Sequence, residues 1–268
     1  MYEAYWGLTE PPFDNSPNPK FLYLSPEHDD AFVRMMYAVR HRKGCAILTG
    51  EYGCGKTTLS RALIQRLEVE RYEIALLTNP SLTSVEFLSE ILYQLGVGSE
   101  EKTKPELLHR LNEVFFRNYQ NGRDSVIIVD EAQLIADDAV FEELRLLMNF
   151  QTDDRFLVTI LLIGSLELTV KVRRLKPLDQ RIAIRYHLNT LDDTHTAQYI
   201  MHRLKMAGRD SHIFTDAAVR LVFDFTRGTP REINNLCDIA LLAGYSKKVN
   251  EIDETIIAGA IRDIVGVS

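Results

Sequence analysis

The chain has 268 residues, enough for one large domain or two smaller ones with a substantial core. Hydrophobic residues make up 46% and charged residues 26%, and no apolar run approaches the roughly 18 residues that cross a bilayer. Without a signal-peptide pattern at the N-terminus, no membrane insertion and a cytoplasmic location are expected. A net charge of −7 argues against constitutive nucleic-acid binding, and three unclustered cysteines argue against a disulfide framework.

In chain order, an extended, proline-rich lead-in over residues 11–19 precedes a helix. Ser25 is placed to cap that helix, which runs to Arg40 with Pro26 in its first turn. Short apolar runs then alternate with segments of helical spacing. The predicted strands are 45–49, 73–78, 125–130, 157–164 and 182–188, and the predicted helices among them are 56–67, 84–95, 105–119 and 138–149.

After Leu191 the apolar spacing is helical throughout, which predicts helices over 195–207, 216–225, 230–245 and 253–265. Strands that alternate with helices predict an α/β fold with a parallel five-stranded sheet. The all-helical remainder predicts a second, smaller domain. We place the boundary near residue 190, so the expected domains are 1–190 and 191–268.

Residues 50–57 fit the phosphate-binding pattern G-x-x-x-x-G-K-[ST] at every fixed position, between a predicted strand and a predicted helix. The glycines allow dihedrals that turn successive N–H groups toward phosphate oxygens, and the helix adds its positive end. The lysine can reach the β- and γ-phosphates, and the Thr57 hydroxyl can ligate Mg²⁺. This context makes a glycine-rich surface turn the weaker interpretation. The expected ATP-contacting residues are Gly50, Glu51, Tyr52, Gly53, Cys54, Gly55, Lys56, Thr57 and Thr58.

A second, acidic motif ends the apolar run 126–129 with Asp130 and Glu131. In phosphate-loop proteins, an Asp at such a strand end holds Mg²⁺, and an adjacent Glu can orient and polarise the attacking water. An acidic turn leading into the next helix is the alternative interpretation. Two carboxylates at the end of a buried strand are unfavourable without a cation or hydrogen bonds, so the pair favours a hydrolytic site.

Ser165 follows the strand-like run 159–164 and could contact the γ-phosphate, or it could cap the next helix. Arg181 precedes the last predicted strand and suits an arginine finger, which stabilises transition-state charge in a neighbour's site. A surface salt bridge is the alternative for Arg181. The competing candidates for the finger are Arg173, Arg174 and Arg185.

Arg231 follows Pro230 at the start of a helix in the second domain. The helix dipole disfavours a cation at this end, so the placement indicates a functional reason, and delivery toward a bound phosphate is one. The alternative is an exposed helix end in contact with water.

Together these segments resemble the AAA+ ATPases of the general secretion pathway protein A (ExeA-type) family. The lead-in is the most specific part of the match, which spans nearly the whole chain. The stretches that carry the resemblance are Tyr5-Trp6-Gly7-Leu8, Pro11-Pro12-Phe13, Pro17, residues 21–28, residues 49–58, Asp130-Glu131-Ala132-Gln133, Asp179-Gln180-Arg181-Ile182, residues 199–204 and residues 228–234.

The resemblance implies a P-loop AAA+ αβα sandwich with a C-terminal helical lid. It implies that Lys56, Thr57, Asp130 and Glu131 form the hydrolytic site, that Arg181 acts in trans and that Arg231 acts in cis from the lid. It also implies homo-oligomers, hexameric or helical. Two features depart from the family: Ser165 stands where Gln is usual, and the sequence shows no transmembrane helix or periplasmic domain. A truncated chain and a stand-alone ATPase both remain open.

Three functions are compatible with these motifs. The first is an ATP-hydrolysing motor or regulator for assembly of a cell-envelope system, such as type II secretion, a pilus or polysaccharide export, with a protein partner. The alternative is a DNA-linked regulator similar to the transposition ATPases of the MuB, IstB and TniB type. The third is a nucleotide-gated scaffold that hardly turns over, against which Glu131 argues. The lead-in and the acidic balance favour the first, whereas the missing membrane segment favours the DNA-linked alternative.

Overall fold

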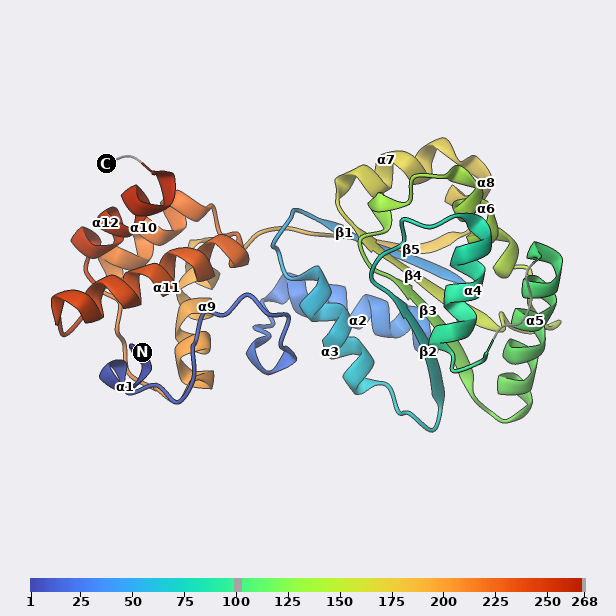
Figure 1. The fold of residues 1–268 in the computed structure, drawn as a ribbon, viewed down its shortest axis with the longest axis horizontal. Coiled ribbons are helices and arrows are strands. Elements are labelled where there is room, and N and C mark those ends of the chain that lie inside the picture. The colour runs from blue at the N-terminus through green and yellow to red at the C-terminus, as the bar shows by residue number, and fades with distance from the viewer. Residues whose placement is uncertain (99–102, 267–268) are drawn as a thin grey trace. The chain divides into compact units, whose positions relative to one another are not determined.

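The computed structural model describes residues 1–98 and 103–266. The chain divides into two compact units (Figure 1). The sheet unit comprises Asp29–Glu51 and Leu59–Leu188. The helical unit comprises Met1–His28, the short segment Tyr52–Thr58 and the chain from Asn189 onward.

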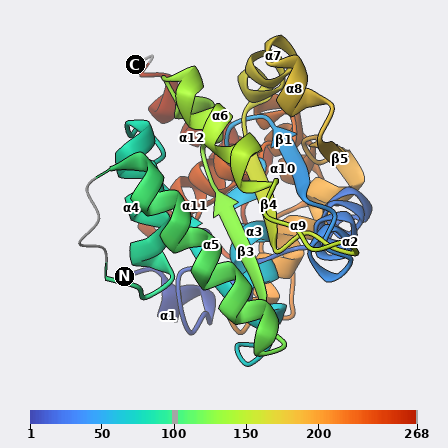
Figure 2. The same cartoon turned by 90° about the vertical axis from the view of Figure 1, so that its right-hand side faces the viewer.

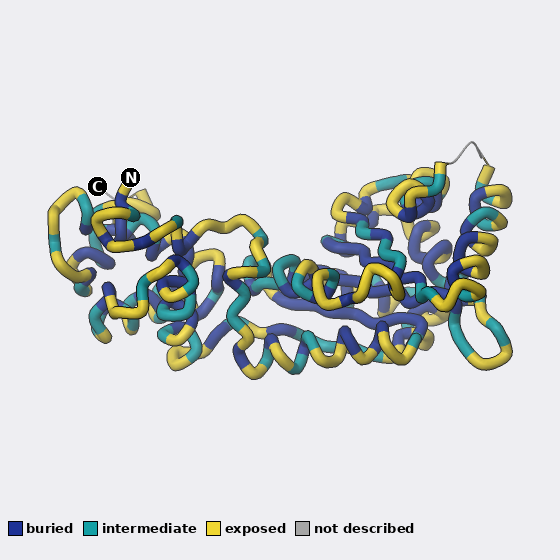
Figure 3. The backbone as a smooth tube through the Cα atoms, turned by 90° about the horizontal axis from the view of Figure 1, so that it is seen from below, coloured by how far each residue is buried: buried dark blue, intermediate teal, exposed yellow. Residues whose placement is uncertain are grey.

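The sheet unit is built on five parallel strands in the order β2-β3-β4-β1-β5. The three inner strands are buried along nearly their whole length (Figure 3), whereas the edge strand β2 contains partly buried residues and the edge strand β5 contains partly buried and exposed ones. This burial on both faces explains why the inner strands read as continuous apolar runs. The strands are β1 (Cys45–Gly50), β2 (Tyr72–Leu77), β3 (Asp124–Val129), β4 (Val158–Gly164) and β5 (Ile182–Leu188), which confirms the predicted sheet.

Helices cover both faces of the sheet and complete the αβα layers. The views of Figures 1 and 2 place α2 and α3 on one face and α4, α5 and α6 on the other. The second face contains a core in which Ile127 and Leu162 meet Phe87 of α4 and Phe115 of α5. The bounds are α2 (Pro26–Arg40), α3 (Lys56–Arg66), α4 (Ser84–Gln94), α5 (Lys104–Gln120), α6 (Asp138–Leu147), α7 (Leu166–Arg174) and α8 (Lys176–Asp179).

The helical unit joins four C-terminal helices to the lead-in. The helices are α9 (Asp193–Met206), α10 (Asp216–Thr226), α11 (Pro230–Lys247) and α12 (Glu254–Val265). Side chains cap the N-termini of three of these helices. Asp192 accepts from the N–H of His195 in α9, Thr215 from that of Ala218 in α10, and Asp253 from that of Ile256 in α12. The Asp192 cap explains why α9 begins at Asp193, whereas the apolar spacing alone predicted that the helix begins at residue 195.

The lead-in differs from the expected division of the chain. It contains a short helix, α1 (Glu3–Trp6), and a 3₁₀ turn, η1 (Pro19–Phe21). Trp6, Phe13 and Phe21 are buried in the core of the helical unit, where the Trp6 indole N–H donates to the Leu241 carbonyl oxygen at 3.0 Å. Residues 1–28 therefore belong with the C-terminal helices and not with the sheet, because their aromatic side chains complete that core. Within the part of the chain that the structure describes, no helix has both the length and the apolar character to cross a bilayer.

Candidate nucleotide-binding site

The glycine-rich loop connects β1 to α3. Gly53 and Gly55 have φ angles of 81° and 99°, in the region where a side chain would clash with the backbone. Gly50 differs from the prediction, since it is the last residue of β1 and is not among the glycines of positive φ. The unusual backbone is thus confined to the middle of the loop. Backbone turns of this kind form concave groups of N–H donors that bind anions, so the loop fits a chain of phosphates.

A buried histidine at the start of α2 holds this loop. His28 is 3% exposed, and its Nε2 lies 2.9 Å from the carbonyl oxygen of Cys54. A carbonyl can only accept, so Nε2 carries the hydrogen and Nδ1 accepts from the Ser25 hydroxyl at 2.7 Å. Burial lowers the pKa of His28, against the opposing effects of the Cys54 carbonyl and the charge of Glu27. The neutral ring is therefore the form that this hydrogen-bond chain requires.

The start of α11 contacts the same loop. The N–H of Arg231 donates to the Gly53 carbonyl oxygen at 3.2 Å. A Cβ atom built on Gly53 would lie only 2.7 Å from Cβ of Arg231, so only glycine allows this approach. The Arg231 side chain itself is exposed. Within the helical unit, the backbone of Arg231 thus lies beside the glycine-rich loop.

Lys56 lies at the first position of α3 and is 6% exposed. Its Nζ is 5.8 Å from the ring centroid of Tyr52, which is itself 55% exposed. A cation over an aromatic face is attracted by the ring quadrupole. The lysine head group is therefore held against the loop to which it belongs.

The acidic motif and Ser165 follow strands whose carboxyl ends meet at one edge of the sheet. β4 pairs with both β3 and β1, so Asp130 after β3, Ser165 after β4 and Glu51 after β1 lie along that edge. Asp130 Oδ1 accepts from the N–H of Glu131 at 2.9 Å. Glu131 has a φ of 52°, an uncommon conformation for a residue with a side chain and one that recurs at functional sites. Carboxylate and hydroxyl oxygens are ligands that Mg²⁺ prefers, so the Asp130 side chain of the sheet unit and the Thr57 side chain of the helical unit are each chemically suited to bind it.

Ser165 occupies the N-cap position of α7 without making a side-chain cap. Its hydroxyl oxygen is buried and has no hydrogen-bond partner within residues 1–98 and 103–266. The capping interpretation of this serine is therefore wrong. An unpaired buried hydroxyl is unfavourable. Of the two interpretations of Ser165, helix capping and contact with the γ-phosphate, only the second remains.

Sequence reasoning did not single out Gln133 as a functional residue. Its side chain, 3% exposed, bridges the N–H of Ser165 and the carboxylate of Glu131. The available signals were its position two residues after Glu131 and its place in the stretch 130–133 of the family resemblance, because the contact with Ser165 joins residues 32 apart in the sequence.

Arg181 lies on the surface, immediately before β5. Its Nη1 donates to Asn149 Oδ1 at 2.7 Å and approaches the Arg145 carbonyl oxygen at 3.5 Å. These partners are uncharged, so the guanidinium charge is not neutralised by them. The competing Arg185 instead pairs with Asp179 at 2.8 Å.

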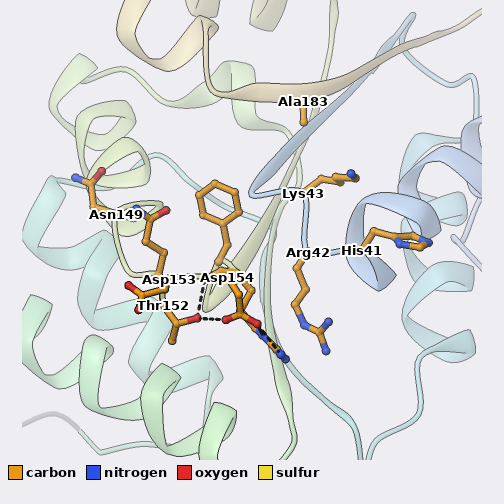
Figure 4. A pocket seen from close by; sticks show the side chains of 11 residues that line it. His41, Arg42, Lys43, Asn149, Thr152, Asp153, Asp154 and Ala183 are labelled. Carbon is orange, nitrogen blue, oxygen red and sulfur yellow. Dashed lines mark hydrogen bonds and ion pairs between the residues drawn. The ribbon is translucent and has the colours of Figure 1, made fainter.

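A cavity of about 1080 Å³ opens at the opposite edge of the sheet (Figure 4). It is lined mainly by residues that precede β1 and β4, including the basic run His41, Arg42 and Lys43. Arg42 pairs with Asp124 at 2.7 Å, and Arg155 pairs with Asp154 at 3.0 Å. The charges here are largely compensated, so this basic run does not form a phosphate site comparable to the glycine-rich loop.

The profile of the AAA domain family matches residues 39–171. The chain is 39% identical over 270 residues to general secretion pathway protein A of Aeromonas hydrophila. That alignment covers all of this chain and 49% of the relative, so the chain spans about half the length of the curated relative.

Solved structures show the same fold at low sequence identity. The ORC2 protein of Aeropyrum pernix superposes with a TM-score of 0.71 at 19% identity, covering 94% of this chain and 71% of that one. The RuvB Holliday junction branch migration motor of Thermotoga maritima gives a TM-score of 0.61 at 19% identity, covering 89% and 70%. These likenesses support the P-loop αβα fold alone. The full-length similarity to the secretion protein and the AAA domain match lead to one conclusion: the chain carries an AAA domain and is related along its whole length to general secretion pathway protein A.

Proposed function

We propose that this chain binds ATP with Mg²⁺ and hydrolyses it. In this proposal the backbone from Gly50 to Thr58 and the Lys56 ammonium bind the phosphates, with Ser165 reaching the γ-phosphate. Thr57 and Asp130 hold the metal, whose charge neutralises the phosphate oxygens during transfer. Glu131 orients and polarises the attacking water.

The observation that carries the proposal is the pair of positive φ angles at Gly53 and Gly55, in the loop that follows β1. The carboxyl end of β1 lies at the same edge of the sheet as the carboxyl end of β3, which Asp130 and Glu131 follow. A glycine-rich surface turn would need neither these dihedrals nor the buried His28 that supports them. The AAA+ fold itself implies nucleotide binding, while hydrolysis and the role of each residue are the steps that need testing.

We propose further that the active sites are shared between copies in a homo-oligomer, hexameric or helical. Arg181 is exposed and its guanidinium contacts neutral oxygens, so its charge is available to a neighbouring copy. Arg231 acts within its own copy, which its backbone contact with the loop supports. Hydrolysis in an isolated copy is then slow, because the cation that stabilises transition-state charge is missing.

The biological role that fits best is assembly of a cell-envelope system in the general secretion pathway, on the cytoplasmic side and with a protein partner. The 39% identity to general secretion pathway protein A supports this role. The acidic net charge of −7 supports it over a DNA-linked role, because strong DNA binding needs a basic surface.

The test is ATP hydrolysis as a function of protein concentration, for the wild type, Glu131→Gln and Arg181→Ala, with and without DNA. We expect a rate per copy that rises with concentration and is lost in both variants, while ATP still binds. A rate per copy that is independent of concentration would contradict shared sites. Stimulation by DNA that falls steeply with salt would contradict the envelope role and favour the transposition-type alternative.

A further inference from the structure

The Gln133 side chain lies between two residues of the proposed site, and its orientation is settled by its partners. The Ser165 backbone N–H can only donate, so the Gln133 oxygen Oε1 accepts from it, at 3.0 Å. The Glu131 carboxylate can only accept, so the Gln133 nitrogen Nε2 donates to Glu131 Oε2, at 2.5 Å. One amide thus joins the end of β4 to the acidic motif after β3.

The surroundings of this amide are built to keep it in place. Lys171 Nζ donates to the backbone oxygens of Gln133 and Ile135, at 2.6 and 2.7 Å, and so fixes the turn that carries the side chain. Gly164 leaves room for the amide, because a Cβ atom there would lie 2.5 Å from Gln133 Oε1. The bridge therefore depends on two neighbours that have no other part in the proposed chemistry.

We propose that Gln133 is a positioning residue for Glu131, which it orients and couples to residue 165. This inference rests on the proposed hydrolytic function. The amide occupies Glu131 Oε2, so Oε1 is the oxygen that orients the water. A base acts only when it is held within hydrogen-bond reach of the proton that it abstracts.

The bridge also links two events in the proposed cycle. The residue whose N–H binds Gln133 is Ser165, whose buried hydroxyl has no partner among the described residues. A γ-phosphate bound by that hydroxyl would act on the same residue that holds the amide. Occupancy of the phosphate site is thereby transmitted to the orientation of Glu131 through a single side chain.

Three variants separate this role from a purely structural one. Gln133→Glu keeps the side-chain volume and the acceptor for Ser165 but places a carboxylate against Glu131. Gln133→Met keeps the length and removes both hydrogen bonds. Gln94→Met on α4 is the matched control, because it makes the same change at an exposed glutamine that also donates to a glutamate, Glu90. Circular dichroism and thermal melts establish that each variant is folded.

We expect both Gln133 variants to lower kcat by about tenfold or more, since a misplaced catalytic group typically costs such factors, while KM and the affinity for a non-hydrolysable ATP analogue stay within about twofold. Gln94→Met should keep kcat within about twofold. Gln133 variants with wild-type kcat would overturn the inference. So would an equal fall in kcat in all three variants, because the loss would then not depend on the bridge.

The decisive measurement combines Gln133→Met with Glu131→Gln. If Gln133 acts through Glu131, the second change leaves the residual rate of the Glu131→Gln variant unchanged. A further multiplicative loss would overturn the inference, because Gln133 would then act independently. If the wild type binds ATP but hydrolyses it no faster than Glu131→Gln does, the proposed hydrolytic function itself fails, an outcome that is distinct from either result.

Discussion

At the scale of single residues, the glycine-rich loop is held by side chains that no phosphate-binding pattern specifies. The pattern accounts for Gly53, Gly55 and Lys56. It does not account for His28, whose ring joins Ser25 to the Cys54 carbonyl oxygen. An unpaired buried carbonyl costs about 1–3 kcal/mol, so loss of this ring would disturb the loop directly.

His28 makes the stability of the protein depend on pH. Burial lowers its pKa in the folded chain, whereas the unfolded imidazole keeps its ordinary pKa of 6.5. As the pH falls, the unfolded state therefore takes up a proton first, and the free energy of unfolding declines below pH 6.5. The stability that the neutral ring contributes is fully present above this pH.

We predict that His28→Gln flattens this decline, as measured by urea unfolding across the range below neutrality. Burial also lowers the pKa of His202, which acts in the same direction but is present in both proteins and cancels in their difference. Parallel pH profiles of the free energy of unfolding for the wild type and the variant would contradict the assignment.

At the scale of elements, the lead-in works as part of the core of the helical unit. Phe13 is 2% exposed and stacks edge-on with Phe214, with 6.0 Å between ring centroids. Arg203 donates to the backbone oxygens of Pro12 and Asp14 and lies over the Phe21 ring at 4.6 Å. A segment without long regular structure is thus fixed by apolar burial and by one buried cation.

We predict that Phe13→Ala lowers the free energy of unfolding of the helical unit by about 3–5 kcal/mol, the usual cost of emptying a buried Phe site. Trp6 is the single tryptophan of the chain and lies in the same core, so its fluorescence reports the unfolding of this unit. Tyr93→Ala on α4, where the side chain is 73% exposed, should leave the fluorescence transition unchanged. An unchanged midpoint for Phe13→Ala would mean that the lead-in does not contribute to the core.

The same elements explain which features could be predicted. The sheet followed from the apolar runs, because inner parallel strands are buried on both faces and leave a continuous signal. The partner of the lead-in could not be predicted, since its aromatic residues show no periodicity and their burial depends on helices far away in the sequence, as with Trp6 and Leu241, which are 235 residues apart. Gln133 was missed for the same reason, because its contact with residue 165 joins positions 32 apart in the sequence. The prediction of unusual dihedrals at Gly50 was wrong, because the motif does not specify the residue at which the preceding strand ends.

At the scale of the whole molecule, Arg181 connects the proposed chemistry to assembly. A ring or a helical filament joins unlike surfaces of successive copies, so each nucleotide site faces a different surface of its neighbour. Arg181 is exposed, and its guanidinium contacts Asn149 and the Arg145 backbone instead of a carboxylate. This arrangement favours a cation supplied across the interface over one that neutralises charge within its own copy.

Mixing two inactive variants tests this arrangement. Arg181→Ala keeps an intact Glu131 but supplies no finger, and Glu131→Gln keeps the finger but has no base. We predict that each alone is inactive and that an equal mixture regains hydrolysis, because about a quarter of randomly formed interfaces pair an intact base with an intact finger. The matched control replaces Glu131→Gln by the double variant Glu131→Gln/Arg181→Ala, which should restore nothing. A mixture that stays as inactive as its components, although its copies co-assemble, would show that Arg181 does not act on the neighbouring site.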